Sequence, residues 1–254
     1  MFKISAQGHR EVPPSVRTLD LPPGFRPVAL RELHDAHQYA TAHAAALGAG
    51  ALVFVGRFDV AEFAVVLEPA EPLAAARRAF YAGMLALADT LAALAPPETS
   101  IAIAWPDAVH VGGRLVGGGR LTWPPGAEEE ATPHWLVFGA LIRLVSMSDG
   151  ETGLHSPATA LQDEGFSKIG VERFIEGFAR HLMARLDHWC EEDFVALGRH
   201  FLLMQKRECG VHLAIDANGD LRIERPGTPV VRRDLRSALE SPSWLDPTME
   251  VPRR

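Results

Sequence analysis

The sequence predicts an α+β fold, with a mixed sheet flanked by helices and then a small β-rich domain. Up to residue 205, apolar residues recur with the two-residue period of strands in some segments and with the helical period in others, and these segments interleave. Two strands of this region are joined by a Gly-Gly turn, so the sheet contains a hairpin and cannot be wholly parallel. Beyond residue 205, short alternating strands flank an Asn-Gly turn.

Composition and charge exclude several classes of protein. The 254 residues are 47% hydrophobic, as expected for one large domain with or without a small one. A net charge of -7 without a basic cluster argues against a nucleic-acid partner. No apolar run approaches the roughly 18 residues of a membrane span, and the opening MFKISAQGHR lacks the apolar core of a signal peptide. We therefore expect a cytoplasmic protein without a membrane partner. Cys190 and Cys209, the only cysteines, predict neither a disulfide framework nor a zinc site.

The N-terminal part of the chain predicts an arm, a helix and two strands. Residues 1–25 are rich in proline and are expected to form an extended arm. Residues 31–47 are alanine-rich and predict a helix, which the glycines of LGAGAL end. Residues 51–55 are apolar enough for a short buried strand, and the alternation in residues 62–67 predicts another.

The middle of the chain predicts a long helix and the rest of the main sheet. Residues 73–94 carry apolar side chains at helical spacing and are followed by Pro-Pro, which ends the helix. Strands are expected at 101–105 and 109–111, and the Gly-Gly turn leads into a returning strand at 114–121. Residues 135–145 are almost continuously apolar, which favours a central position in the sheet.

Helices then lead to the C-terminal strands. Helices are expected near 158–164 and at 171–189 and 194–204. The segment VHLAIDANGDLRIER predicts a hairpin, and TPVVRRDL could add a third strand. The predicted domains are therefore the main domain at 26–205 and a small β-rich domain at 206–254.

Three consecutive glycines in the returning strand, within AWPDAVHVGGRLVGGGRL, indicate a candidate site. Glycine weakens a strand and usually marks a bulge or a close approach of the backbone to another group. The glycines could leave room for a ligand, or they could relieve a tight crossing of the sheet. A bulge at Gly117–Gly119 would instead shift the side-chain alternation by one residue, so that Arg120 would face the same side as Leu115.

The order of these segments resembles the catalytic core of biotin and lipoate protein ligases over residues 26–205. The family motif K-W-P-N-D, a strand, a turn and K-hydrophobic-A/G-G corresponds without a gap to A-W-P-D-A-V-H-V-G-G-R-L-V-G-G. WLVFGALIRL stands where the family has a strand ending G-x-G-I-N. The family's D-S-T-N at the head of the first helix corresponds to His34, Asp35, Ala36 and His37.

The resemblance implies an acyl-transfer site. In the family, biotin or a lipoyl-type acid attacks ATP to give an acyl-adenylate, which a lysine of a carrier domain then attacks. It implies biotin, lipoate or octanoate as ligand, and a small carboxylic acid or acyl compound and a biotinyl or lipoyl carrier domain as partners. The ligand-binding residues that it implies here are Trp105, Asp107, Arg114, Gly117, Gly118, Gly119, Arg120, Gly139 and Arg143.

The sequence departs from the family at the cations that would hold a triphosphate. Leu115 and Ala104 stand at the positions of the two motif lysines. The basic loop G-R-G-R-x-G-R that covers the adenylate has no counterpart, except for Gly56-Arg57 as a remnant. These departures argue against ATP binding. Two functions stay open: a ligase-family enzyme with altered or lost ATP-dependent activity, and a non-catalytic homologue that binds a ligand or a carrier.

Two further candidates have alternative interpretations. His34 and His37 have metal-ligand spacing, but no third ligand accompanies them, so no metal site is predicted. Arg143 replaces the neutral asparagine of G-I-N, and a guanidinium can hold a carboxylate through two parallel hydrogen bonds. The alternative for Arg143 is a structural ion pair with Asp107 or Asp149.

Overall fold

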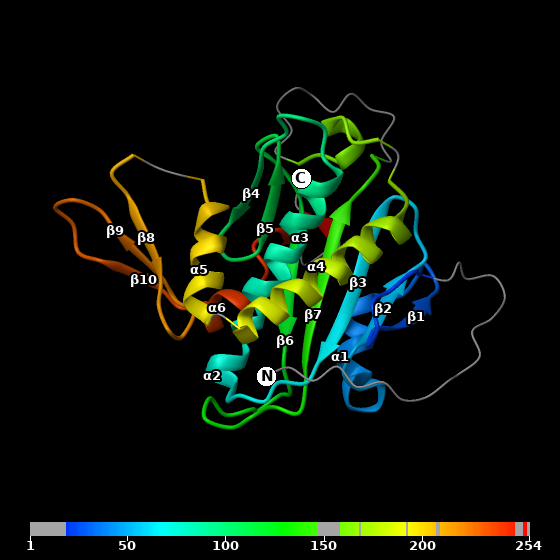
Figure 1. The fold of residues 1–254 in the computed structure, drawn as a ribbon, viewed down its shortest axis with the longest axis horizontal. Helices are drawn as coiled ribbons and strands as arrows, with labels where there is room; N and C mark the ends of the chain where they lie inside the picture. Colours follow the sequence, from blue (N-terminus) through cyan, green and yellow to red (C-terminus); the bar gives the residue numbers. More distant parts are fainter. Residues whose placement is uncertain are drawn as a thin grey trace.

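The structure is a computed structural model that describes residues 19–146, 158–167, 169–191, 193–206, 209–246 and 251–252. Its main body is a seven-stranded mixed sheet (Figure 1), which confirms the predicted fold class. The first two strands of the sheet are parallel, and all other neighbours are antiparallel. The strand order is β1 (Arg26–Leu30), β2 (Ala51–Val55), β3 (Val60–Leu67), β7 (Leu136–Arg143), β6 (Arg114–Thr122), β5 (Ala108–Val111) and β4 (Ile101–Ala104).

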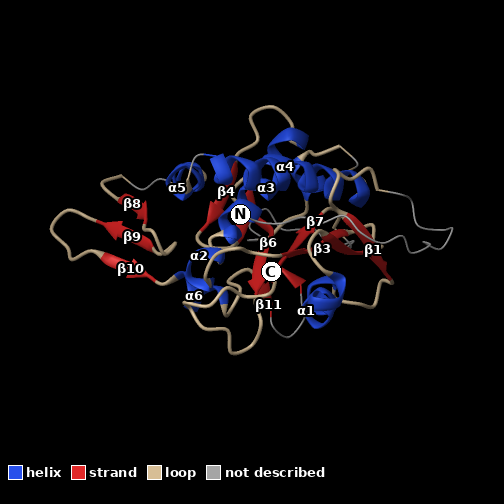
Figure 2. Ribbon diagram, turned by 60° about the horizontal axis from the view of Figure 1, so that its bottom comes forward, coloured by secondary structure: helices blue, strands red, loops and turns tan. Residues whose placement is uncertain are grey.

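Helices cover the two faces of the sheet unequally. Figure 2 shows α3 (Ala79–Leu94) and α4 (Val171–Glu191) on one face and α1 (Ala36–Leu47) on the other. The larger core lies under α3 and α4, where the rings of Phe138 and Phe178 stack with centroids 5.7 Å apart. Alternate residues of the central strand β7 serve both faces, since Phe138 packs in this core and Val137 packs under α1. The opposite face, which we call the site face, is the one on which α1 lies, and this helix leaves part of it uncovered.

Two predictions for the N-terminal part were incomplete. The helix expected from residue 31 begins at Ala36, where the carboxylate of Asp35 accepts a hydrogen bond from the Gln38 N–H at 2.7 Å. Residues 26–30 form β1, a strand that the sequence did not predict. This strand pairs with β2 alone at the edge of the sheet, and its five residues are at most half-buried, so its apolar pattern is weak. Most of the predicted arm, residues 1–18, lies outside the described residues.

The expected helix over residues 73–94 is broken in two. A short α2 (Leu73–Ala76) is followed by α3, with Arg77 and Arg78 between them. The N–H groups of Leu73 and Ala74 donate to carbonyls of the loop after β6, and Arg77 pairs with Glu129 of that loop. The helix predicted near 158–164 is a single 3₁₀ turn, Leu161–Glu164. The prediction of α4 was correct, and α5 (Phe194–Leu203) follows it as expected.

The C-terminal strands form a separate small sheet beyond α5, at the left of Figure 1. Its order is β10 (Val231–Arg233), β9 (Leu221–Glu224) and β8 (His212–Ile215), which confirms the predicted hairpin and third strand. An unpredicted helix, α6 (Leu235–Leu239), comes next. The division of the chain at residue 206 stays a prediction.

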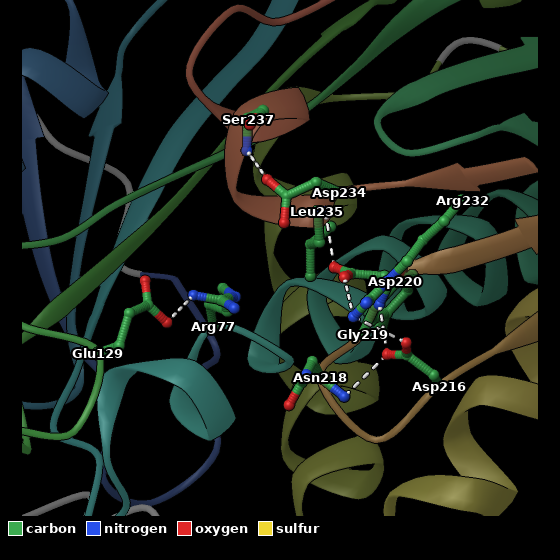
Figure 3. Close-up of polar contacts among 11 residues, drawn as sticks. Arg77, Glu129, Asp216, Asn218, Gly219, Asp220, Arg232, Asp234, Leu235 and Ser237 are labelled. Atoms are coloured by element: carbon green, nitrogen blue, oxygen red, sulfur yellow. Dashed lines mark hydrogen bonds and ion pairs between the residues drawn. The ribbon is translucent and has the colours of Figure 1, made fainter.

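Polar contacts hold the small sheet and α6 together (Figure 3). Arg232 forms ion pairs with Asp216 and Asp220 at 3.1 Å and 2.6 Å. The other oxygen of Asp220 accepts a hydrogen bond from the Leu235 N–H, and Asp234 caps α6 through the Ser237 N–H. The turn between β8 and β9 is therefore attached to β10 through Arg232 and to α6 through the Leu235 N–H.

The segment after α6 folds back onto the site face. It carries Trp244, which is 1% exposed, and β11 (Leu245–Asp246), which pairs with β12 (Val251–Pro252). In Figure 2, β11 lies on the same side of the sheet as α1. The end of the chain is therefore part of the face that carries the predicted site.

Candidate functional site

Each of the three glycines of β6 lies against a close internal neighbour. A Cβ on Gly117 would lie 1.9 Å from the carbonyl oxygen of Leu141, and Gly117 has a φ of +151°. A Cβ on Gly118 would lie 2.1 Å from the carbonyl oxygen of Asp107 and 2.4 Å from the indole of Trp244. Gly119 faces Met84 and Phe138 in the core. Close packing of the protein on itself therefore requires these glycines.

A bulge is present at Val116, directly before the glycines at which the sequence predicted it, and it re-aims Arg120. On β5, Val109 and His110 are adjacent, but their partners on β6 are Gly117 and Leu115, which leaves Val116 as the extra residue. A bulge of this kind changes which face the following side chains occupy. Arg120 consequently faces the site face, as Leu115 does. Leu115 packs there with the buried cluster of Val60, Ala108, Leu141 and Trp244.

A small cavity, which we call the polar cavity, opens on this face. Its volume is about 170 Å³. It lies where the head of α1, the connection between β2 and β3, the strands β3, β6 and β7, and the C-terminal segment meet. The residues that line it are Glu32, Leu33, His34, Asp35, Arg57, Glu62, Arg120, Leu141, Trp244 and Leu245.

Arg120 is held by Asp35 across the polar cavity. Its Nη2 donates to both carboxylate oxygens of Asp35 at 2.7 Å, and the two side chains are only 19% and 15% exposed. Burial alone would raise the pKa of Asp35, but the charge and hydrogen bond of Arg120, with the Gln38 N–H, hold it below its usual value. The pair is therefore ionised and its charges cancel.

The second arginine of the polar cavity is neutralised in the same way. Arg57 donates to the two carboxylate oxygens of Asp59 at 3.0 Å and 2.6 Å. This hydrogen-bonded contact lowers the pKa of Asp59 in spite of partial burial. Arg57 belongs to the Gly56-Arg57 segment, which the resemblance offers as a remnant of the basic loop, and it already has Asp59 as a counter-ion.

Glu62 is a buried carboxyl group of the polar cavity that the sequence analysis did not select. It is 7% exposed, and its Oε1 accepts a hydrogen bond from the Ala36 N–H at 2.8 Å. Burial raises its pKa, and the nearby Asp35 adds to this effect. The signal in the sequence was an acidic residue inside an otherwise apolar strand.

His37 lies beside the polar cavity and is neutral. Burial lowers its pKa to about 3, and the positive charge of Arg120 contributes. Its Nε2 shares a hydrogen bond of 2.7 Å with the hydroxyl of Thr122, and its ring lies where a Cβ on Gly139 would be. Among the described residues, no group of three His, Cys, Asp or Glu side chains could hold a metal ion.

Trp105 and Asp107, two of the predicted ligand-binding residues, do not line the polar cavity. Trp105 packs against the core under α3, where its indole N–H donates to the hydroxyl of Tyr81 at 2.9 Å. Asp107 is 1% exposed, and its carboxylate accepts hydrogen bonds from the backbone N–H and the hydroxyl of Ser243. Asp107 thus attaches the C-terminal segment that carries Trp244.

Arg114, Gly139 and Arg143 also lie outside the lining. Arg114 forms an ion pair with Glu164, next to the hairpin turn. Arg143 ends β7 opposite Val60. Of the nine predicted residues, only Arg120 lines the polar cavity, and Gly118 contributes by making room for Trp244.

Comparisons with known proteins point to the biotin and lipoate protein ligases. The family model described as biotin/lipoate A/B protein ligase matches residues 21–203. The chain is similar to a biotin protein ligase-like protein of unknown function from Silicibacter sp. TM1040, at 26% identity and a TM-score of 0.73, covering 87% of this chain and 99% of that one. No curated protein matches the chain significantly.

Biotin protein ligases share the fold at lower identity. The enzyme from Aquifex aeolicus has 14% identity and a TM-score of 0.61, covering 83% of this chain and 99% of that one. The enzyme from Leishmania major, solved with biotinyl-5-AMP, has 16% identity and a TM-score of 0.54, covering 84% and 99%. In the part of the chain that the structure describes, no helix is long and apolar enough to cross a membrane.

Proposed function

The chain belongs to the biotin/lipoate A/B protein ligase family, and from this premise we propose that it binds a small, uncharged acyl-type ligand without activating it with ATP. The polar cavity is the proposed site, because it lies where the positions of three family motifs meet. These are the head of the first helix at Asp35, the loop remnant at Arg57 and the glycine-rich strand at Arg120.

The cancelled charges of the polar cavity are the observation that carries the proposal. A polyphosphate needs cations that are free to bind it. Both arginines in the lining already have an aspartate partner, in Asp35–Arg120 and Arg57–Asp59. The lining also contains Glu32 and Glu62, which would repel a phosphate or a carboxylate. An uncharged polar group, such as an amide, avoids this repulsion and can still use the carboxyl groups as hydrogen-bond partners.

The apolar side of the site supports the same conclusion. At the position of the family's motif lysine, Leu115 packs against Trp244 and Leu141. Trp244 fills the space above Gly118, and its indole N–H donates to the Gly119 carbonyl at 3.0 Å. The remaining volume, about 170 Å³, is below the roughly 300–1,000 Å³ of typical ligand pockets. An acyl group can enter such a space, but a whole acyl-adenylate would require the C-terminal segment to move.

Native mass spectrometry with paired ligands tests the proposal. The protein is incubated with biotin, lipoate or octanoate, with the corresponding primary amides, and with ATP and Mg²⁺. We expect an adduct with at least one amide that is no weaker than that of its acid, and no ATP adduct. A ligand-dependent exchange of pyrophosphate into ATP would show the ligase reaction and refute the proposal. Failure of all the amides to bind would refute the ligand class.

An extension of this experiment separates the ligase-family enzyme from the non-catalytic homologue. A biotinyl or lipoyl carrier domain is added with ATP and each acid, and its mass is measured. The proposal expects an unchanged carrier mass, because Arg57 and Arg120, the arginines of the polar cavity, are already paired with aspartates. An acylated carrier would establish the enzyme instead.

A further inference from the structure

A second hollow of the surface lies at the β4 edge of the large sheet. It is a groove of about 560 Å³ between the edge strand β4, the end of α5 and the small sheet, which we call the wing groove. Figure 1 shows these three parts side by side, with α5 between β4 and β8. The residues that line it are Ile103, Ala104, Trp105, Leu202, Leu203, Gln205, Lys206, Val211, His212, Leu213, Leu221, Ile223, Arg225 and Arg233.

The charged side chains in the described lining of the wing groove are basic. Among the residues that the structure describes, the lining contains Lys206, Arg225 and Arg233 and no aspartate or glutamate, in a chain whose net charge is -7. Lys206 and Arg233 are exposed, and neither forms an ion pair with another described residue. Arg222 and Arg232 of the same small sheet are both paired with carboxylates. Lys206 and Arg233 are therefore available to an anion.

The floor of the wing groove contains a hydrogen-bond donor without an acceptor. Gln205 is 9% exposed, and its Oε1 accepts a hydrogen bond from the Trp105 N–H at 3.2 Å. This contact fixes the orientation of the amide, because the backbone N–H can donate only to the oxygen. The Nε2 of Gln205 is buried and has no acceptor among the described residues. A buried unsatisfied donor requires an explanation, and a bound acceptor is one.

The walls of the wing groove are held before any ligand arrives. Leu221 is 3% exposed and Ile223 is 7% exposed, so these side chains of β9 are anchored. The turn next to them is fixed by the pairs of Arg232 in Figure 3. It is also held from the large domain, where the hydroxyl of Tyr81 donates to the Gly219 carbonyl at 2.5 Å. A preformed groove loses less free energy of ordering when it binds a ligand.

We propose that the wing groove binds a small amphipathic anion, which is an apolar chain that ends in a carboxylate. The chain packs on Trp105, Leu213 and Ile223. The carboxylate lies among Lys206 and Arg233 and accepts a hydrogen bond from Gln205. The volume is within the range of small-molecule sites, which favours a small ligand over a macromolecule. This site is separate from the polar cavity and does not depend on the proposed function.

Calorimetry with two chains of equal length and opposite charge tests this site. Decanoate and decyltrimethylammonium are titrated into the full-length protein below their micelle concentrations. We expect decanoate to bind at least tenfold more tightly. Equal affinity of the two probes, or no heat from decanoate at millimolar concentration, would overturn the proposal.

Variants assign the binding to the groove. Lys206→Gln/Arg233→Gln removes two exposed cations and should weaken decanoate binding at least tenfold. Arg222→Gln is the matched control, because Arg222 lies on β9 but does not line the groove, and the affinity should change less than twofold. In Gln205→Glu, one carboxylate oxygen can still accept from the Trp105 N–H, and the other replaces the Nε2 donor. The negative charge then repels the carboxylate of decanoate, so this variant should abolish binding. Circular dichroism verifies the fold of each variant, and undiminished binding by the folded double variant would refute the site.

Discussion

Replacement of Asp35 by asparagine is the sharpest test of the paired charges in the polar cavity. Asparagine is as good an N-cap residue as aspartate, so Asp35→Asn should keep the hydrogen bond to the Gln38 N–H and remove only the charge. Breaking a buried ion pair costs about 3–5 kcal/mol, and an exposed pair is worth about 0.2–1 kcal/mol. Since the side chains of Asp35 and Arg120 are 15% and 19% exposed, we expect a loss of about 2–3 kcal/mol in the free energy of unfolding.

A double-mutant cycle isolates the pair from other effects of the substitutions. Asp35→Asn, Arg120→Gln and the double variant are unfolded with urea at pH 7. The double variant should lose about 2 kcal/mol less than the sum of the single variants. Asp20→Asn is the control, because Asp20 pairs with Arg180 at an exposed position and its loss should cost under about 1 kcal/mol. A coupling energy near zero, or equal losses for Asp35→Asn and Asp20→Asn, would refute the reasoning.

Four other substitutions test the neighbourhood of the site. The pKa of His37 is lowered from 6.5 to about 3, so the free energy of unfolding falls as the pH drops below 6.5, where the unfolded chain takes up a proton that the folded protein does not. His37→Leu should therefore flatten the pH dependence of urea stability between pH 6.5 and 4 by up to about 1.4 kcal/mol per pH unit. An unchanged slope would contradict the buried neutral histidine. The raised pKa of Glu62 makes its ionisation unfavourable as the pH rises above 4.5, so Glu62→Gln should stabilise the protein at pH 7 but not at pH 4, and equal effects at both pH values would count against this sign. Trp244→Ala should cost about 3–5 kcal/mol and let longer amides bind in the native mass spectra, whereas unchanged stability would show that the indole is not buried. Gly118→Ala should release the C-terminal segment, seen as faster proteolysis there, because a Cβ would lie 2.1 Å from a backbone oxygen; unaltered proteolysis would contradict the close packing.

The main elements of the fold could be predicted because each carries its own pattern. Strands β2, β3 and β7 are apolar through most of their length, and α4 has a regular apolar face. The strand β1 was missed because its pairing with β2 depends on residues about 25 positions away. The break before α3 depends on contacts of Arg77 and Leu73 with a distant loop, which no local pattern reveals.

In the candidate site, too, features with a local pattern could be predicted and contacts between distant residues could not. The consecutive glycines suggested a bulge as one of several alternatives, and the bulge at Val116, directly before them, gives Arg120 the direction that this alternative implied. Its partner Asp35 comes from a helix 85 residues earlier in the chain. The fold-back of Trp244 over Gly118 spans more than 120 residues and leaves no periodic signal. Side chains selected by their position in a motif, such as Trp105 and Asp107, instead hold structural contacts.

Calorimetric titration of the wild-type protein with ATP and Mg²⁺ measures whether the polar cavity can hold a triphosphate. The site lacks the two motif lysines and the basic loop, and each charge-assisted hydrogen bond that is lost removes roughly 1.5–3 kcal/mol. Three such losses correspond to on the order of 4 kcal/mol or more, and therefore to an affinity reduced more than about a thousandfold. We expect a dissociation constant for ATP in the millimolar range or weaker. A micromolar dissociation constant would contradict it.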